Sequence, residues 1–162
     1  MNEVSWFVAH TLPRREKKLK QFCEREGFHA VLPCYRTVRK YRGKTAVFFK
    51  PLFPGYLFVR LLAEHRQKVA QNDHVARLLT VPDQITLARQ LEEILKALET
   101  ELEIVLAPEI GAGQRVKIKS GSLRGMEAWV EQRYGVSTVL LRLDFIGQAA
   151  AVKVSADDLE LT

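Results

Sequence analysis

The chain has 162 residues, of which 47% are hydrophobic and 27% charged, a composition that argues against intrinsic disorder. No apolar run approaches the roughly 20 residues that cross a bilayer, and no signal peptide is evident, so we expect a cytoplasmic protein with no membrane partner. Cys23 and Cys34 are the only cysteines, and their spacing indicates neither a disulfide framework nor a zinc site. No metal or other cofactor is therefore expected.

The net charge of +6 is concentrated in the first part of the chain. Residues 1–102 carry 18 Lys and Arg against 11 Asp and Glu, whereas residues 103–162 carry 7 against 8. Within the first part, residues 14–50 hold 12 basic and 3 acidic side chains. This local excess fits a surface that faces nucleic acid, although a solvated basic surface without a partner is the simpler alternative.

The first 26 residues predict a strand followed by a helix. Residues 5–11 are rich in aromatic and β-branched side chains, which favours a buried strand. Pro13 stands where a helix can start, and we expect the helix to run from Arg14 to Glu26 and to end at Gly27. One side of this helix is apolar and the other carries mostly cationic side chains: Arg14, Lys17, Lys18, Gln21 and Arg25.

Residues 29–62 predict three strands. The first runs from about 29 to 41, turns at residues 42–44 and is followed by a second at 45–50, which makes a long ribbon with a basic tip. The third spans residues 56–61. A polar helix at 64–71 and a short strand at 75–81 come next. Leucine and isoleucine at helical spacing between Leu87 and Leu98 then predict an amphipathic helix.

Proline and glycine mark the end of the first domain. Residues 101–113 contain Pro108, Gly111 and Gly113 without a sustained period. We therefore place one domain at 1–102, a linker at 103–112 and a second domain at 113–162. Short strands at 115–119, 127–132, 137–144 and 149–154, separated by glycine-containing turns, favour a small β-barrel over a helical hairpin.

Three features together resemble the NusG family of transcription factors. They are the aromatic first strand, the octapeptide LFPGYLFV at residues 52–59, and the segment GQRVKIKSGSLRG at 113–125, which resembles a KOW motif. The resemblance implies an α+β fold, with a NusG-type N-terminal α/β sandwich built on a mainly antiparallel sheet and a C-terminal KOW SH3-like barrel. It also implies a non-enzymatic protein that modulates transcriptional pausing or termination.

The resemblance implies particular contacts as well. In this family, an aromatic-lined surface of the N-terminal domain docks on the clamp helices of the largest RNA polymerase subunit, and Phe53, Tyr56 and Phe58 match that surface. All three residues being part of the hydrophobic core is the alternative. The family's KOW-domain partner loop corresponds to Phe145, Ile146, Gly147 and Gln148. Ile146 and Gln148 replace an aromatic residue and an arginine, which argues against Rho and leaves a small-subunit ribosomal protein as a partner.

Within the family, a specialised RfaH-like, operon-specific antiterminator is the branch that the sequence favours, with a general NusG-type factor as the alternative. The basic first domain supplies phosphate contacts to non-template DNA or nascent RNA, and nearby Tyr35, Tyr41 and His10 can stack on bases. The residues that we expect to bind nucleic acid are His10, Arg14, Lys17, Lys18, Arg25, Arg39, Lys40, Arg42 and Lys44. The branch's His-Thr-Thr loop has no counterpart at residues 66–68.

Two other classes of protein are alternatives to a transcription factor. An enzyme would need a nucleophile and base, paired acids, a phosphate-binding glycine loop or a metal-ligand cluster, and the sequence contains no such pattern. An RNA-binding or ribosome-associated KOW protein would lack the aromatic octapeptide and would place basic charge in the barrel, which here is slightly acidic. We therefore expect a monomeric transcription factor without catalytic residues.

Overall fold

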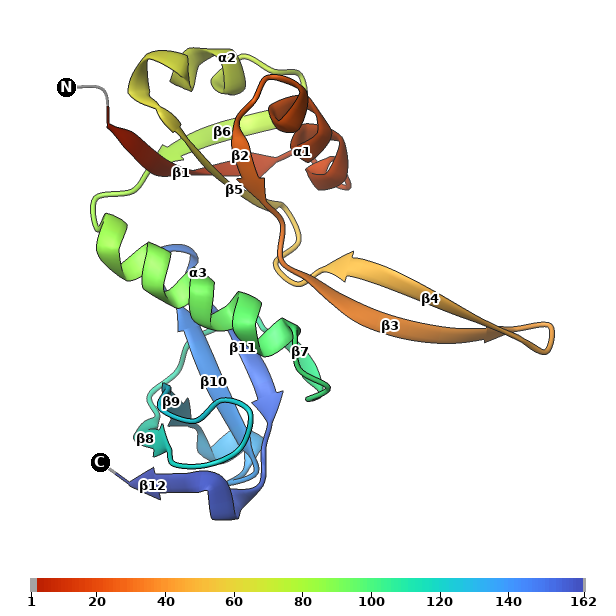
Figure 1. Cartoon of the computed structure of the whole chain (residues 1–162), viewed down its shortest axis with the longest axis vertical. Coiled ribbons are helices and arrows are strands. Elements are labelled where there is room, and N and C mark those ends of the chain that lie inside the picture. Colours follow the sequence, from red (N-terminus) through yellow and green to blue (C-terminus); the bar gives the residue numbers. More distant parts are fainter. Residues whose placement is uncertain (1–2, 162) are drawn as a thin grey trace. The chain divides into compact units, whose positions relative to one another are not determined.

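The computed structural model describes residues 3–161, and contacts within the chain divide it into two compact units. The first unit comprises Met1–Cys34 and Phe53–Thr86, and the second comprises Tyr35–Leu52 and Leu87–Thr162. The chain combines a few α-helices with mainly antiparallel strands, so the predicted α+β class with mainly antiparallel sheets is confirmed (Figure 1). The division into domains at 1–102 and 113–162 remains a prediction.

Four antiparallel strands form the sheet of the first unit. They are β1 (Val4–Thr11), β2 (His29–Val31), β5 (Tyr56–Leu62) and β6 (Val75–Thr80), in the order β2-β5-β1-β6. In this register Val8 of β1 lies opposite Phe58 of β5 and Leu79 of β6. The β-branched and aromatic residues along β1 and β5 suit a pleated, buried surface, which explains why these segments form strands.

One face of this sheet packs against two helices, α1 (Glu16–Arg25) and α2 (Arg66–Ala70), the second preceded by a 3-10 turn at Ala63–His65. Leu19 and Cys23 of α1 and Val69 of α2 are completely buried against the strands. The strand residues of this cluster alternate along β1 and β5: Phe7, Ala9, Leu57, Val59 and Leu61. Helical periodicity on α1 and strand periodicity on the sheet thus produce one hydrophobic core.

Two predicted boundaries between residues 14 and 41 are wrong. The helix begins at Glu16 rather than near Pro13, because Leu12–Arg15 forms a turn in which Arg14 has a φ of 62°. The predicted strand at 29–41 is two strands, since β2 ends at Val31 and β3 begins at Cys34. Pro33 lies between them, and a proline cannot donate a hydrogen bond to a strand ladder.

The second unit contains the ribbon, which we define as the two-stranded sheet of β3 (Cys34–Tyr41) and β4 (Lys44–Pro51). Its two-residue turn consists of Arg42 and Gly43, with φ values of 48° and 78°. Positive φ at both central residues is the geometry of a type I′ hairpin turn, whose twist matches that of the flanking strands. The predicted hairpin is therefore present, and β4 is one residue longer at each end than the strand predicted at 45–50.

The remainder of the second unit is α3 (Gln84–Leu98) and the C-terminal sheet, which we define as strands β7 to β12. These are β7 (Ile104–Ala107), β8 (Gln114–Ile118), β9 (Glu127–Val130), β10 (Thr138–Leu143), β11 (Gln148–Lys153) and β12 (Leu159–Leu161). They are ordered β12-β8-β9-β10-β11-β7, with antiparallel pairing throughout. The β-rich C-terminal region and the amphipathic helix agree with the sequence analysis.

The structure corrects the sequence analysis at both ends of this sheet. Residues 103–112 are not a continuous linker, because Ile104–Ala107 form β7 and pair with β11 through Val105 opposite Ala151. The last strand, β12, was not predicted and pairs with β8. The glycine-containing turn predicted between β8 and β9 is present, and its Gly121 and Gly125 have φ values of 87° and 93°, which residues with a Cβ atom rarely adopt.

Candidate functional site

The octapeptide at residues 52–59 contains a tight turn that joins the ribbon to β5. The Tyr56 amide donates to the Phe53 carbonyl at 3.2 Å, with Pro54 and Gly55 between them and Gly55 at a φ of 89°. Proline followed by a residue with positive φ is the pattern of a type II turn. The sequence Phe-Pro-Gly-Tyr therefore specifies the backbone that places Tyr56 at the start of the strand.

A buried carboxylate on α1 holds this turn against the first unit. Glu16 is 6% exposed, and its Oε2 accepts a hydrogen bond from the Gly55 amide at 3.1 Å. The Thr11 amide, at the end of β1, donates to the Gly55 carbonyl at 2.8 Å. Both polar groups of the Gly55 backbone are thus satisfied by residues far away in the sequence. The sequence did not predict a buried role for Glu16, because an acidic residue at the start of a helix usually faces solvent.

The three aromatic residues expected to contact a partner differ in their exposure. Phe53 and Phe58 are 1% and 0% exposed, whereas Tyr56 is half-buried. The expectation that all three present their rings to a partner is therefore not met here. The reason for Phe58 is that three successive residues of β5 are buried, so both faces of the strand are covered at that point.

Tyr56 belongs to the second face of the sheet, which we define as the face opposite the α1 and α2 core. Strand alternation places Trp6, Val8 and His10 of β1 on it, next to Arg60, Phe58 and Tyr56 of β5. His10 stacks on Tyr56, with ring centroids 5.1 Å apart and planes 25° apart, and its ring also lies beside Gly55. Two residues predicted for different partners, the exposed His10 and the half-buried Tyr56, thus form one aromatic patch.

Four of the basic residues predicted to bind nucleic acid lie on the exposed side of α1 and in the turn before it. Lys17, Lys18 and Arg25 are exposed on α1, and Arg14 is exposed in the turn before it. Glu24 and Glu26 reduce the positive charge at the C-terminal end of the helix, where Glu24 pairs with Lys20 and Glu26 with Lys68. The N-terminal end is therefore the more strongly basic part of α1.

The ribbon is the most cationic element of the chain. Residues 35–51 contain six basic side chains and no acidic one, and Arg39, Lys40, Arg42 and Lys44 are all exposed. Large apolar side chains are exposed between them: Val38, Tyr41, Val47, Phe48 and Phe49. The guanidinium of Arg42 lies 5.9 Å from the centre of the Tyr41 ring. Phe48 and Phe49 were missed, because an apolar run in a strand is ordinarily read as buried.

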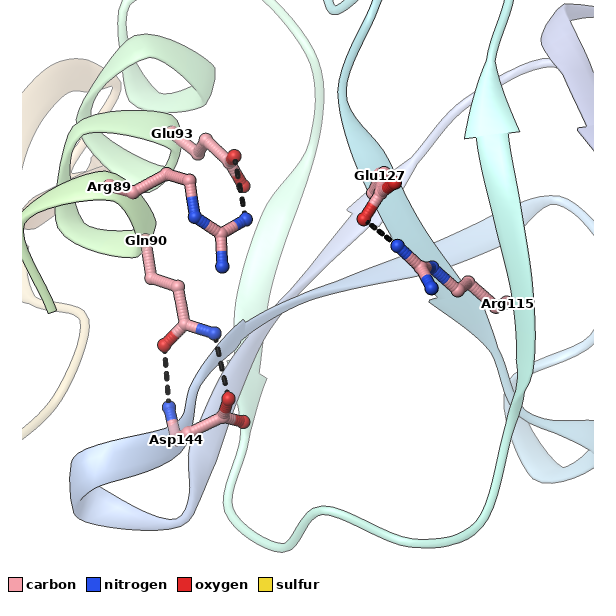
Figure 2. A network of polar contacts seen from close by, with 6 residues as sticks. All are labelled: Arg89, Gln90, Glu93, Arg115, Glu127 and Asp144. Atoms are coloured by element: carbon pink, nitrogen blue, oxygen red, sulfur yellow. Dashed lines mark hydrogen bonds and ion pairs between the residues drawn. The ribbon is translucent and has the colours of Figure 1, made fainter. Parts of the chain in front are cut away.

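The predicted KOW-domain partner loop follows β10. Residues Asp144–Ile146 form a 3-10 turn, Gly147 adopts a left-handed conformation with a φ of 67°, and Gln148 starts β11. Phe145 and Ile146 are half-buried. Gln90 of α3, which is 4% exposed, donates to Asp144 Oδ2 at 2.8 Å and accepts from the Asp144 amide at 2.9 Å (Figure 2). The base of this loop is therefore attached to α3.

Among residues 3–161, no group of three or more His, Cys, Asp or Glu side chains is arranged to hold a metal ion. No helix within this described range is both long and apolar enough to span a bilayer. Burial raises the pKa of the Cys23 thiol to about 11, so this group is neutral and unreactive at physiological pH.

Comparison with known families decides the identity. The family model described as transcription termination factor NusG matches residues 4–106, which include the first sheet, the ribbon and α3. The chain belongs to the NusG family. No curated protein matches it significantly. NusG proteins are non-catalytic transcription factors that interact with RNA polymerase and act in termination and elongation. The match ends before residues 113–125, whose likeness to a KOW motif remains a resemblance.

Proposed function

We propose that this NusG-family protein is an operon-specific elongation factor of the RfaH-like branch, which docks on RNA polymerase and holds nucleic acid close to it. The observation that carries the proposal is the ribbon, with six basic and no acidic side chains between residues 35 and 51. Phosphates attract such a surface, and contacts to bases supply selectivity. A factor limited to selected operons needs both kinds of contact.

The end of the second face that carries Tyr56 and His10 supplies the docking surface for the polymerase clamp helices, because Val8 and Phe58, farther along the same face, are completely buried. Tyr56 and His10 present stacked rings there, and aromatic side chains are frequent anchors of protein interfaces. Phe53 and Phe58 do not contact the polymerase directly; they are buried in the core and stabilise the turn and the strand that carry Tyr56. The basic residues Arg14, Lys17 and Lys18 add a second cationic surface, at the N-terminal end of α1.

The C-terminal region, residues 113–162, serves as a KOW-like module for a further partner. Its partner loop, Phe145 to Gln148, contains no basic residue and has an isoleucine where general NusG proteins have an aromatic residue. This composition favours a small-subunit ribosomal protein over Rho. Residues 108–112, which have no regular secondary structure, fall within the proposed boundary between the two functional parts.

Binding to core RNA polymerase tests the docking step. Tyr56→Ala should weaken binding, whereas Val136→Ala, which truncates an exposed apolar side chain of the C-terminal region, should leave it unchanged. Loss of a central aromatic anchor costs on the order of 2 kcal/mol, which corresponds to roughly a 30-fold rise in Kd. Circular dichroism of both variants verifies folding. Wild-type protein that binds neither core polymerase nor an elongation complex would refute the proposal.

Operon specificity is tested separately on elongation complexes. An RfaH-like factor should act at one pause sequence and be inactive on complexes stalled elsewhere. Replacing Arg39 and Lys44 by glutamine should remove the action at that sequence while binding to core polymerase persists. A factor that acts alike on every stalled complex would instead be a general NusG-type protein.

A further inference from the structure

A short segment after β7 is held against the C-terminal sheet by three polar side chains. The Glu131 carboxylate accepts a hydrogen bond from the Gly111 amide at 2.7 Å. The Arg133 guanidinium donates to the Glu109 carbonyl at 2.8 Å, and Arg142 donates to the Gly111 carbonyl at 3.3 Å. We call this segment, together with the three side chains that bind it, the clasp.

Each of the three side chains is oriented by a second contact. Glu131 is 3% exposed, and its other carboxylate oxygen accepts from Arg133 Nε at 2.8 Å. A carboxylate is stable at such a buried position only when donors satisfy its oxygens. The Cζ atom of Arg142 lies 4.3 Å from the centre of the Trp129 ring. The clasp is therefore a preformed site for the backbone that it binds.

Close packing explains the glycines of this segment. A Cβ atom on Gly111 would lie 3.1 Å from Glu131 Oε1, and one on Gly113 would lie 3.2 Å from the Val130 carbonyl oxygen. Neither glycine has a positive φ, so backbone conformation alone would admit other residues at both positions. A larger side chain at Gly111 should therefore push the segment away from the sheet.

The clasp decides how much chain connects α3 to the C-terminal sheet. Because α3 ends at Leu98 and β7 begins at Ile104, the connection consists of the five residues 99–103. If β7 and the clasp detach, the connection extends to the start of β8 at Gln114 and comprises the fifteen residues 99–113. At about 3.5 Å per residue, an extended chain spans roughly 20 Å in the first case and roughly 55 Å in the second.

The contacts of β7 are weak enough to break while the rest of the sheet stays folded. This strand has four residues, lies at the edge of the sheet and exposes half of Val105. Its neighbours on β11 include Ala149 and Ala151, whose small side chains bury little apolar surface against it. Segments with few buried apolar contacts open locally at a lower free energy than the whole domain.

We propose that the clasp is a conformational device that sets the reach of the C-terminal sheet. Closed, it leaves a five-residue tether, which keeps Asp144 close to Gln90 and so favours their hydrogen bonds. Open, it makes the tether three times as long, which lowers the effective concentration of the two groups about 5-fold. The proposal concerns the tether alone and holds whichever partner the C-terminal region binds.

Hydrogen exchange of the full chain, followed by NMR, measures opening of the clasp. The Lys153 amide donates to the Glu103 carbonyl, so ladder alternation directs the amides of Val105 and Ala107 toward β11. Gly111→Val should speed exchange of these two amides roughly 5- to 150-fold, the effect of overpacking a close contact.

Ala112→Val is the matched control, because it adds a side chain of the same kind at the neighbouring, exposed position. It should change exchange of the β7 amides by no more than about 2-fold. Glu131 gives a second pair of variants. Glu131→Ala removes the acceptor of the Gly111 amide and should speed exchange, whereas Glu131→Gln keeps an oxygen there and should lie closer to wild type. Slow exchange of the Leu140 amide verifies that β10 stays folded in every variant.

Distances between two spin labels measure the reach. The labels are attached at Lys96→Cys and Gln114→Cys in a chain whose Cys23 and Cys34 are replaced by alanine. Gln90→Leu is added to both samples, so that the tether alone limits the separation. The distances should be short and narrowly distributed with the clasp intact. Gly111→Val should broaden them toward values up to roughly 35 Å longer.

Three results would overturn the inference. Wild-type β7 amides that exchange as fast as those of an unstructured chain would show that the clasp is open in solution. Equal exchange in Gly111→Val and Ala112→Val would show that close packing at Gly111 does not hold the segment. A distance distribution that stays the same when the β7 amides become unprotected would show that the clasp does not set the reach.

Discussion

Gln90 and Asp144 are joined by two hydrogen bonds that run in opposite directions, although 54 positions separate them in the sequence. The side-chain amide of Gln90 donates to the Asp144 carboxylate and accepts from the Asp144 backbone amide (Figure 2). Both capacities of one buried amide are thus used by a single residue. Asp144 directly precedes Phe145, so α3 fixes the point from which the partner loop departs.

Gln90→Leu keeps the volume of the side chain and removes both bonds. We expect the free energy of unfolding of the second unit to fall by about 1–2 kcal/mol, since two modest hydrogen bonds are lost and Asp144 is exposed enough for water to replace them. The measurement is urea unfolding followed by Trp129 fluorescence in a Trp6→Phe background, which leaves a single tryptophan in the second unit. Lys96→Leu, at an exposed position of α3, is the control. Identical midpoints for Gln90→Leu and the parent would show that the contact contributes no stability.

The buried carboxylate of Glu16 should stabilise the turn that carries Tyr56. Glu16→Ala leaves the Gly55 amide without its acceptor, and an unsatisfied buried donor costs about 1–3 kcal/mol. Glu16→Gln retains a carbonyl oxygen in the same place and should recover most of that loss. The two variants are compared by thermal unfolding monitored by circular dichroism. A Gln variant as unstable as the Ala variant would mean that negative charge, rather than the hydrogen bond, matters at this position.

Several elements follow from the sequence because their signals are local. The leucine spacing of α3 predicts a helix whose apolar side is buried at Leu87, Leu91 and Ile94. The glycine-containing turns predicted between the C-terminal strands include Gly121 and Gly125, which adopt positive φ between β8 and β9. Each of these elements is predictable because it depends on the backbone preferences and spacing of residues that are close together in the sequence.

The features that the sequence does not reveal depend on distant partners. β7 is only four residues long and is a strand because β11 pairs with it some 45 residues later. Glu16 is buried because the turn at Gly55 supplies its donor. The octapeptide identifies Phe53, Tyr56 and Phe58 as a group, but period-two alternation cannot say which side of a strand is covered. Only the structure therefore reveals that Phe53 and Phe58 are buried.

The Cys23 thiol gives a pH-dependent prediction. Burial raises its pKa from 9.0 to about 11, so the folded state holds this proton more tightly than the unfolded state does. The corresponding stability is fully present below pH 9 and is lost as the pH rises from 9 to about 11, by on the order of 2 kcal/mol. Urea unfolding at pH 8 and pH 11 measures the difference for wild type and for Cys23→Ala.

Cys23→Ala removes the titrating group, so its loss of stability between the two pH values should be smaller than that of wild type by this amount. Reaction with a thiol reagent at pH 8 gives an independent measurement: Cys23 should remain unmodified in the folded protein and react after unfolding. Rapid modification of Cys23 in the native state would contradict the burial on which the prediction depends.

Tyr56 and Phe58 are two residues apart on β5 and should respond differently to the same truncation. Phe58→Ala empties a fully buried site and should lower the free energy of unfolding by about 3–5 kcal/mol. Tyr56→Ala removes a half-buried ring stacked on His10, so the free energy of unfolding should fall by no more than about 1–2 kcal/mol, while the Kd for polymerase should rise roughly 30-fold. Unfolding by urea and binding to core polymerase are measured on both variants. If Phe58→Ala unfolds no more easily than wild type but abolishes binding, then Phe58 is a contact residue, and β5 must present that ring to the polymerase in a conformation different from this one.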